Sequence, residues 1–491
     1  MVFIPCGRGV HICRRGSWAL IAAIAAALAA SAAVSESVAQ ERGIIPDKEL
    51  MITSLSVVED ASRTANSCDP SSAPVGTLPV WSFGRLMKDM SGSHDPSDFA
   101  LLWLRTWKNA QTINGDVVRA RASIEREVLE PWLARSGGKK LDLRKAPFRL
   151  LAIAFRPDLR DRTKGKAGEG RFIFGAIDRN CQPMQFTVIF EYTLPTASCS
   201  QTMRWAARFH ALGDIPFGKQ YNAGLEAITE TFTAPRPALK RPNGSLLSQL
   251  RTNEISGGSP WQLREFSLVP EGGQHKALLR PATVKQTPKI SVNKSDALRD
   301  FINNNQRAIL NETFVVPASM LAGASVVTGE PWRARGVINN NARHKFALNT
   351  CAGCHATETG VLFVHVGVRE AKTESMLSPF ILGKTGRDPV SGEKRSFSEL
   401  ERRISDYSVL LNTQCRGRSG PGTQSISAQG NVAEQFYCDV SQPNNPNGDY
   451  PAGPTGEGTS FTLSDRLVNN PPGITISGLE QGCIKAGGPL H

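Results

Sequence analysis

The stretch QFTVIFEYTL, residues 185–194, decides the fold prediction. Every second residue from 186 to 192 is apolar or aromatic: Phe186, Val188, Phe190 and Tyr192. The residues between them are Thr187, Ile189 and Glu191. This period of two is that of a β-strand, whose successive side chains point to opposite faces of a sheet. The stretch therefore predicts a strand with one face in a hydrophobic core.

The flanking sequence extends this strand into a domain. Two short apolar runs precede it, FRLLAIAFRPDL (148–159) and GRFIFGAI (170–177), and DRNCQP (178–183) suits a hairpin loop. Two segments predict helices: SHDPSDFALLWLRTWKNAQT (93–112), with Trp103 and Trp107 in the core, and NAGLEAITETFT (222–233). We predict an α+β domain with an antiparallel sheet over residues 76–233.

The second half of the chain has a different composition and predicts fewer regular elements. The proline-rich stretch APRPALKRPNGS opens a predicted linker with short strands, residues 234–293. KSDALRDFINNNQRAIL (294–310) predicts an amphipathic helix that begins at Ser295. From residue 416 the chain is rich in Gly, Pro, Ser and Asn. We therefore predict a loop-rich, partly helical second domain over residues 294–491.

The N-terminus carries the features of an export signal. Arg8, Arg14 and Arg15 precede an apolar run from Trp18 to Val34, and Ser37-Val38-Ala39 offers small residues for cleavage before Gln40. We expect a signal peptide over residues 1–39 and an extended segment over 40–75. No later segment is apolar enough to cross a bilayer, so we expect a periplasmic or extracellular protein with no stable membrane span.

Composition and charge narrow the class of partner. The 491 residues are 40% hydrophobic and 21% charged, as in globular proteins with real cores. The net charge of +13 falls to about +11 without the leader. The basic clusters lack interleaved aromatic residues, so we expect no nucleic-acid partner, and an acidic partner protein fits the charge better.

The cysteine count is consistent with an oxidising compartment. Eight cysteines remain after removal of the leader, and six remain if the close pair Cys351 and Cys354 is committed to a cofactor. The other six form an even set suited to three disulfides. We expect the pairs Cys181–Cys199, Cys415–Cys438 and Cys68–Cys483, among 15 possible connectivities.

The stretch NTCAGCHATETG (349–360) carries the strongest functional signal. Its C-x-x-C-H spacing puts Cys351, Cys354 and His355 on one side of a single helical turn. Two thiols so placed can form thioether bonds to the vinyl groups of one porphyrin edge while the imidazole binds the iron. The pattern predicts covalently attached haem.

At this motif the chain resembles the c-type cytochromes, residue for residue at Cys351, Cys354 and His355. The resemblance implies attached haem c, iron ligation by His355, electron transfer and a redox partner protein. The wider stretch RHKFALNTCAGCHATETGVLFVHV is similar to that of secreted bacterial proteins of unknown activity that carry one such motif.

The sixth iron ligand has two candidates. The family usually supplies a distal methionine, and the only methionine after His355 is Met376; the histidines after it are His365 and His491. GVLFVHVGV (360–368) predicts a strand that carries His365, and the ten residue steps from His355 to His365 can span up to about 33 Å. We expect His365, Met376 or an open position.

Two other interpretations of the motif remain. A zinc site could use Cys351, Cys354 and His365 with either His344 or His355, and Cys351–Cys354 could form a redox disulfide. The function we predict is an exported mono-haem, cytochrome-like electron carrier. The alternative is an exported binding or sensor module in which the haem is structural or ligand-sensing, or in which zinc replaces it. Catalysis would need an open sixth position and a distal acid or base.

Overall fold

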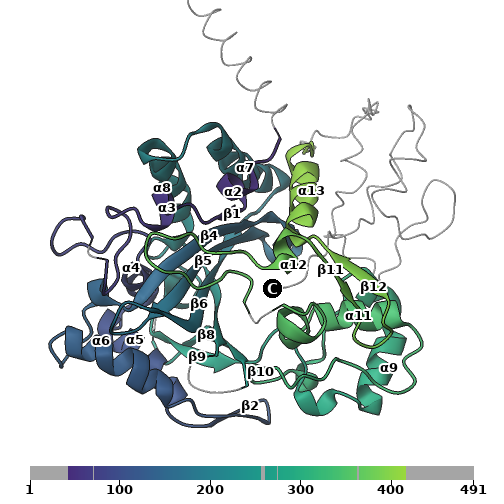
Figure 1. Cartoon of the computed structure of the whole chain (residues 1–491). Helices are drawn as coiled ribbons and strands as arrows, with labels where there is room; N and C mark the ends of the chain where they lie inside the picture. The colour runs from purple at the N-terminus through teal and green to yellow at the C-terminus, as the bar shows by residue number, and fades with distance from the viewer. Residues whose placement is uncertain (1–42, 70, 256–259, 274, 362–363, 416–491) are drawn as a thin grey trace, which may run out of the picture. The chain divides into compact units, whose positions relative to one another are not determined.

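The computed structural model describes residues 43–415, apart from residues 70, 256–259, 274 and 362–363 (Figure 1). The predicted signal peptide, Cys438 and Cys483 lie outside these residues. The chain after Gly43 clusters as one compact unit.

An antiparallel sheet of eight strands organises this unit, which confirms the α+β prediction. The strand order is β1-β4-β5-β6-β7-β8-β10, and β9 also pairs with β8. Its strands are β1 (Met51–Ile52), β4 (Phe148–Arg156), β5 (Lys166–Ile177), β6 (Pro183–Pro195), β7 (Leu247–Glu254), β8 (Gln262–Pro270), β9 (Ala277–Ala282) and β10 (Ser325–Val326). Two small hairpins lie outside it, β2–β3 (Gln111–Ile113, Asp116–Val118) and β11–β12 (Lys384–Arg387, Lys394–Phe397).

Helices surround this sheet on both sides (Figure 1). They are α2 (Pro46–Glu49), α3 (Leu55–Val58), α4 (Phe83–Met90), α5 (Pro96–Leu104), α6 (Glu130–Arg135), α7 (Cys199–Ala211), α8 (Lys219–Thr233), α9 (Asp296–Asn304), α10 (Gln306–Leu310), α11 (Asn340–Leu348), α12 (Pro379–Leu382) and α13 (Glu399–Leu411). Three of the predicted helices are confirmed as α5, α8 and the α9–α10 pair. The side chain of Asp95 accepts from the backbone amides of Ser97 and Asp98 at the start of α5, and Ser295 caps α9 in the same way.

The first face of the sheet packs against an aromatic core. The stretch that predicted a strand forms β6, and its alternating apolar side chains are all buried in this core, as predicted: Phe186, Val188, Phe190 and Tyr192. Phe83 of α4 stacks on Phe148 of β4 with ring centroids 4.0 Å apart. Trp103 and Trp107 are buried beside them, which confirms the packing role expected for both tryptophans.

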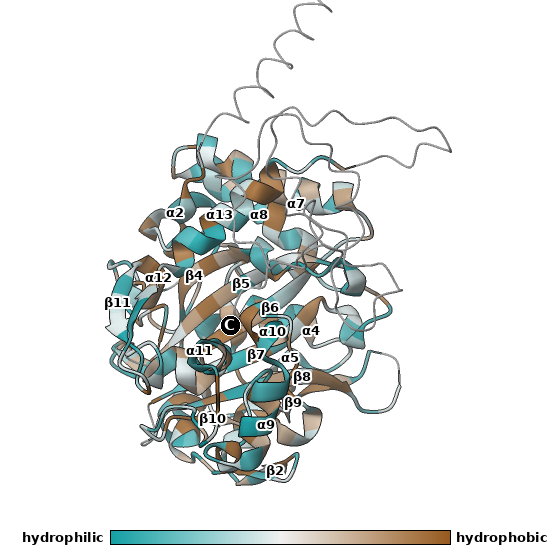
Figure 2. Cartoon of the chain, turned by 90° about the vertical axis from the view of Figure 1, so that its right-hand side faces the viewer, coloured by the Kyte–Doolittle hydropathy of each residue, from teal (hydrophilic) through white to brown (hydrophobic). Residues whose placement is uncertain are grey.

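The second face of the sheet is also buried, although it carries charged side chains. Arg171 of β5, Glu191 of β6 and Arg251 of β7 lie on this face, and each is under a tenth exposed. It is covered by the chain after α11, including α12 (Figure 2). A second hydrophobic cluster, which includes Ile173, Leu348 and Phe380, joins the two layers.

The predicted linker is part of this sheet. Within residues 234–293, β7, β8 and β9 pair with β6 and with one another, so the stretch continues the sheet begun by β4, β5 and β6. The proline-rich segment before them forms turns, with Asn243 at a positive φ of 53°. Periodicity revealed the short strands but not the sheet to which they belong.

Two local predictions were wrong. The segment 40–75 is not simply extended, because it contains α2, β1 and α3, and β1 pairs with β4. Among its described residues, GVLFVHVGV forms no strand; its single ladder contact is the bridge between Val366 and Leu377. Val361, Val366 and Val368 of this stretch instead pack in the hydrophobic cluster that includes Ile173 of β5.

The disulfides differ from the expected pairs. Cys68 pairs with Cys181 and Cys199 with Cys415, with Cα–Cα distances of 5.8 and 5.6 Å. The expected pairs were wrong because sequence proximity was a poor guide: Cys199 begins α7, and Cys415 follows α13, which packs against α7. Two disulfides are typical of an oxidising location outside the cytoplasm.

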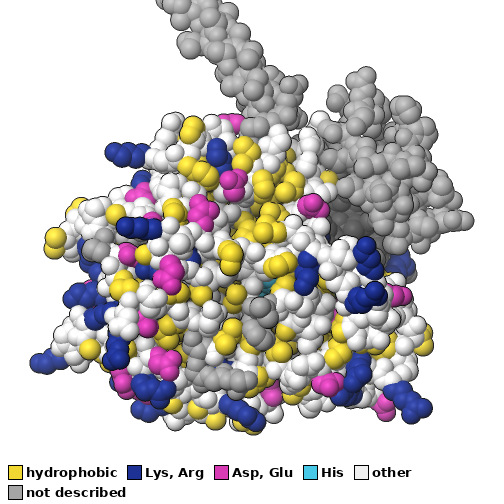
Figure 3. Space-filling model, viewed as in Figure 1, with side chains coloured by type: hydrophobic (Ala, Val, Ile, Leu, Met, Phe, Trp, Pro, Cys, Tyr) yellow, Lys and Arg dark blue, Asp and Glu magenta, His cyan; other side chains and the backbone are white. Residues whose placement is uncertain are grey.

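Within residues 43–415, as far as they are described, no helix is both long and apolar enough to cross a membrane. On the face shown in Figure 3, Lys and Arg side chains are spread widely, with Asp and Glu between them.

The disulfide pairing is open to a direct test. Digestion of the oxidised protein without reduction should release peptides linked through Cys68–Cys181 and through Cys199–Cys415, identified by mass spectrometry. The double variant Cys199→Ala/Cys415→Ala should lose about 2–5 kcal/mol of unfolding free energy, because this bridge closes a loop of over two hundred residues. A peptide that links Cys181 to Cys199 would contradict the structure.

Candidate functional site

The C-x-x-C-H motif lies in a helical turn directly after α11. The side chain of Asn339 caps α11, and after Leu348 a short turn leads into the π-helical segment Gly353–Thr357. The hydroxyl of Thr350 accepts from the amide of Gly353 at 3.1 Å. A Cβ at position 353 would collide with the carbonyl oxygen of Ala347, so this turn requires glycine between the two cysteines.

Both thiols of the motif are buried and form no disulfide. Cys351 packs with Trp261 and Val284, and its amide donates to the hydroxyl of Thr287 at 3.0 Å. Cys354 packs in the second hydrophobic cluster. Burial raises the pKa of both thiols above the usual value. A redox-active cysteine needs a lowered pKa, so the setting does not favour a redox disulfide.

Two imidazoles meet beside Cys354. The rings of His355 and His365 lie 4.3 Å apart between centroids, and Nε2 of His365 is 3.3 Å from Sγ of Cys354. His355 also stacks on Trp261 at 5.2 Å. Nδ1 of His365 is hydrogen-bonded to the hydroxyl of Ser378 at 2.9 Å. The hydrogen bond to Ser378 orients the ring so that Nε2 faces the motif. Metal-binding histidines are commonly oriented in this way, by a hydrogen bond at the ring nitrogen that does not bind the metal.

The remaining candidate ligands lie elsewhere. Met376 is 82% exposed and is not among the residues that line the pocket below the motif. Nδ1 of His344 is hydrogen-bonded to Glu358 rather than directed at the thiols. Of the two candidates for a sixth ligand, the structure places only His365 beside His355.

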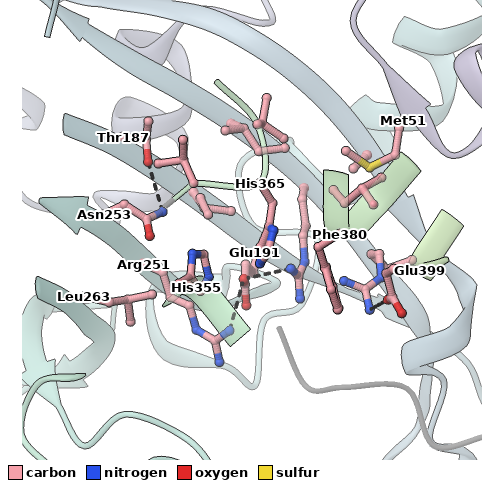
Figure 4. Close-up of a pocket in the computed structure, with 18 of the residues that line it drawn as sticks. Met51, Thr187, Glu191, Arg251, Asn253, Leu263, His355, His365, Phe380 and Glu399 are labelled. Carbon is pink, nitrogen blue, oxygen red and sulfur yellow. Dashed lines mark hydrogen bonds and ion pairs between the residues drawn. The ribbon is translucent and has the colours of Figure 1, made fainter. Parts of the chain in front are cut away.

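The two histidines face a pocket between the motif and the sheet (Figure 4). The pocket has a volume of about 70 Å³, which is much smaller than a haem, so a haem could enter only if the segment that carries the motif moved away from the sheet. One side is apolar, with Ile173, Ile189 and Phe380. The pocket therefore offers an apolar wall and a histidine pair to the same space.

The floor of the pocket is charged. Four arginines and two glutamates line it: Arg156, Arg171, Arg251, Arg403, Glu191 and Glu399. The carboxylate of Glu191 lies 3.2 Å from Arg171 and 3.7 Å from Arg251. Although burial raises the pKa of Glu399, Arg403 and Arg402 outweigh it and lower that pKa to about 2. Each arginine already has a carboxylate partner, because Asp158, Glu169 and Glu265 lie behind the pocket surface and pair with Arg156, Arg171 and Arg251, and Arg403 pairs with Glu399. The floor is therefore a network of buried ion pairs.

The residue types around the motif fit a haem, but the closed structure does not leave room for one. The rings of His355 and His365 lie 4.3 Å apart between centroids, which is too close for a porphyrin to lie between them, so the two histidines would have to separate for both to bind one iron. Cys354 lies beside the pair, and the apolar wall of the pocket would suit a porphyrin face.

The end of the motif turn is held by a buried ion-pair cluster. Arg343 of α11 bonds Glu358 through both terminal nitrogens, at 2.9 and 2.6 Å, and Asp388 at 2.9 Å. Among the described residues, His344, Glu358 and Asp388 form the only group of three or more metal-type ligands whose ligand atoms all lie within 4.8 Å of one another. A divalent ion would have to displace the Arg343 guanidinium that already bridges both carboxylates, so we assign this cluster a structural role.

Sequence reasoning missed the charged floor. Its residues come from β4–β7 and α13, and the sequence analysis assigned no role to the charged side chains among the apolar ones of these strands. The signal was present in GRFIFGAI and QFTVIFEYTL, where Arg171 and Glu191 interrupt apolar runs. Pairing β5 with β6 puts these two residues directly opposite each other.

Comparison with known proteins gives no relationship: no protein-family model, no curated protein and no solved structure matches this chain. The function must therefore be argued from the site alone.

The Arg343–Glu358–Asp388 cluster at the end of the motif turn leads to a stability prediction. Glu358→Gln should cost about 3 kcal/mol of unfolding free energy, because it breaks a buried ion pair and leaves Arg343 under-compensated. The matched control Glu393→Gln, which breaks an exposed pair with Arg395, should cost less than about 1 kcal/mol. Urea denaturation followed by circular dichroism measures both, and equal costs would contradict the assigned role.

Proposed function

We propose that this chain is an exported, c-type cytochrome-like protein that carries one haem, bonded covalently to Cys351 and Cys354, and transfers electrons. One observation carries the proposal: the imidazoles of His355 and His365 lie together beside Cys354, above a pocket of suitable chemistry. When bound, the haem would supply one-electron chemistry at its iron.

The chain's own residues have distinct roles in this proposal. His355 and His365 ligate the iron, and the hydroxyl of Ser378 keeps Nε2 of His365 directed at it. Trp261 supports the ring of His355. Two histidine ligands leave no position for a substrate and give a low reduction potential, which supports electron transfer rather than catalysis.

The location and partner follow from the leader and the charge. We place the protein in the periplasm or outside the cell, because the N-terminal segment has the features of a cleaved signal and the disulfides need an oxidising compartment. The net charge of about +11 without the leader favours an acidic redox partner, whose encounter would weaken as salt is added.

Covalent attachment is the first expected result. Protein matured in a periplasm with haem-attachment machinery, then denatured and separated in SDS, should stain for haem peroxidase activity. Cys351→Ser and Cys354→Ser should each weaken the stain, and the double variant should abolish it, because the thioether bonds are lost. Met376→Ala is the control and should stain as the parent does. Equimolar zinc without haem would refute the proposal.

The axial ligands are the second expected result. His365→Ala should convert low-spin iron to high-spin iron and open it to carbon monoxide, because the sixth position is vacated. Met376→Ala should leave the visible spectrum unchanged, since its side chain is exposed. The opposite pattern would assign Met376 as the ligand. If neither variant changes the spectrum and the parent is high-spin, a haem sensor replaces the electron carrier.

A further inference from the structure

A second cavity lies at one end of the sheet, beside β10 (Figure 1). It has a volume of about 370 Å³, which is within the range of ligand sites. Residues of β10, of the segment 116–121 and of the segment 287–290 line it, together with Trp332 and Ala352. We refer to it as the β10 cavity.

The cavity continues the plane of the sheet, because its walls lie on the two faces of the sheet edge. Val326 of β10 is opposite Gln262 of β8, whose side chain accepts from Nε of Arg121 at 3.2 Å, so the segment 116–121 flanks this face. Ser325 is opposite Leu263, which belongs to the hydrophobic cluster of Cys351 on the other face. The motif turn therefore flanks that second face, and the space between the walls has the place of a further strand.

The edge of β10 that faces this space is unpaired among the described residues, because β10 is the last strand in the order of the sheet. The amide of Val327 donates to the carbonyl of Trp261 at 3.2 Å, so the backbone groups of Val327 face β8. In an antiparallel pair these groups alternate between the two sides of a strand. Three residues therefore direct their N–H and C=O groups away from β8, and all three line the cavity: Ala324, Val326 and Thr328.

This edge offers hydrogen bonds that an extended chain can complete. In the described part of the chain, no hydrogen bond joins the amide of Ala324, Val326 or Thr328 to another segment. Backbone polar groups in folded proteins are almost always bonded, and an unpaired strand edge is a template for another extended chain. A second backbone supplies donors and acceptors at the spacing of the edge, which a compact small molecule does not.

The walls favour apolar side chains on this added strand. Val118 lines one wall and Trp332 the other, and both side chains are buried. Val117 and Ile290 also line the cavity and are 67% and 45% exposed, so they lie at its opening. Successive side chains of an inserted strand would point to the two walls in turn.

A charged ligand is not required. The carboxylate of Asp116 accepts from the amide of Gly323, and the guanidinium group of Arg121 already bonds Gln262 and lies 3.4 Å from the carboxylate of Glu254.

We propose that the β10 cavity binds an extended, uncharged peptide segment with small apolar side chains, which adds a strand to β10. The edge from Ala324 to Thr328 is about 13 Å long, so a segment of about five residues would cover it. The proposal does not depend on the haem, because neither these residues nor Trp332 line the pocket below the histidines.

The neutral peptide acetyl-Ala-Val-Ala-Val-Ala-amide is a suitable probe. Its control is the same peptide methylated on the backbone nitrogens of the three central residues, which removes these donors and blocks strand pairing. Isothermal titration calorimetry on the full mature protein should show saturable, one-to-one binding of the probe, and binding of the methylated peptide should be at least about tenfold weaker. No saturable binding, or equal affinity for the two peptides, would overturn the proposal.

Two variants at one position locate the strand pairing. Val326→Pro removes the outward N–H, and proline is tolerated at such an edge position because this N–H does not bond β8. It should weaken binding of the probe about tenfold or more. The matched control Val326→Ala keeps the N–H and should bind the probe within about threefold of the parent.

Parent-like binding by Val326→Pro would overturn the proposal, and so would an equal loss in Val326→Ala, because side-chain packing would then explain the effect. Thermal unfolding followed by circular dichroism checks that both variants fold. If Val326→Pro does not fold, the comparison of the two peptides on the parent protein still decides the outcome.

Discussion

The pairing of buried charges across the sheet is the constraint on which this structure depends. Arg171 lies opposite Glu191 in the pairing of β5 with β6, and Arg251 lies opposite Glu265 in the pairing of β7 with β8. Ion pairs join these neighbours and connect Glu191 to Arg251. A buried charge without a partner costs several kcal/mol, so a shift of one strand by one residue would break the row. The register of the central strands is therefore fixed on both faces, by aromatic packing on one and by charge on the other.

The charged face also explains why the C-terminal half of the chain folds where it does. The apolar part of this face lies on β1, β4 and β5, where Met51, Ala154 and Ile173 belong to the second hydrophobic cluster together with Phe380 of α12. The charged part lies on β5, β6 and β7, and the pocket lies between it and the covering segment. The Arg343–Glu358–Asp388 cluster then fixes the motif turn from above.

Sequence reasoning recovered what periodicity encodes and missed what depends on distant contacts. Three strands were predictable because each carries its own hydrophobic pattern: 148–159, 170–177 and 185–194. The helix Pro96–Leu104 was predictable because it carries both an apolar pattern and the capping residue Asp95. The membership of β7, β8 and β9 in the same sheet could not be predicted, because the proline-rich turns before them have the composition of a linker. The disulfides failed for the same reason: Cys199 and Cys415 are 216 residues apart and meet through the packing of α7 and α13.

The site shows the same division. Cys351, Cys354 and His355 could be named from spacing alone, but sequence could not choose between His365 and Met376. Their separation along the chain is small, and the bridge between Val366 and Leu377 brings both segments together. The two side chains differ in the direction in which they point. The hydrogen bond to Ser378 holds the ring of His365 towards Cys354, whereas the side chain of Met376 is exposed to solvent.

The burial of the two thiols constrains the order of events under the proposed function. Cys351 is 1% exposed and Cys354 is 0% exposed, beneath side chains of the sheet and of α12. Formation of a thioether bond requires each sulfur to reach a vinyl group, and an enzyme that directs this reaction must reach both. Neither approach is open once the segment has closed over the sheet, and the raised pKa of both thiols makes them poor nucleophiles there. Haem attachment would therefore precede this closure, and the haem would become part of the layer that covers the charged face.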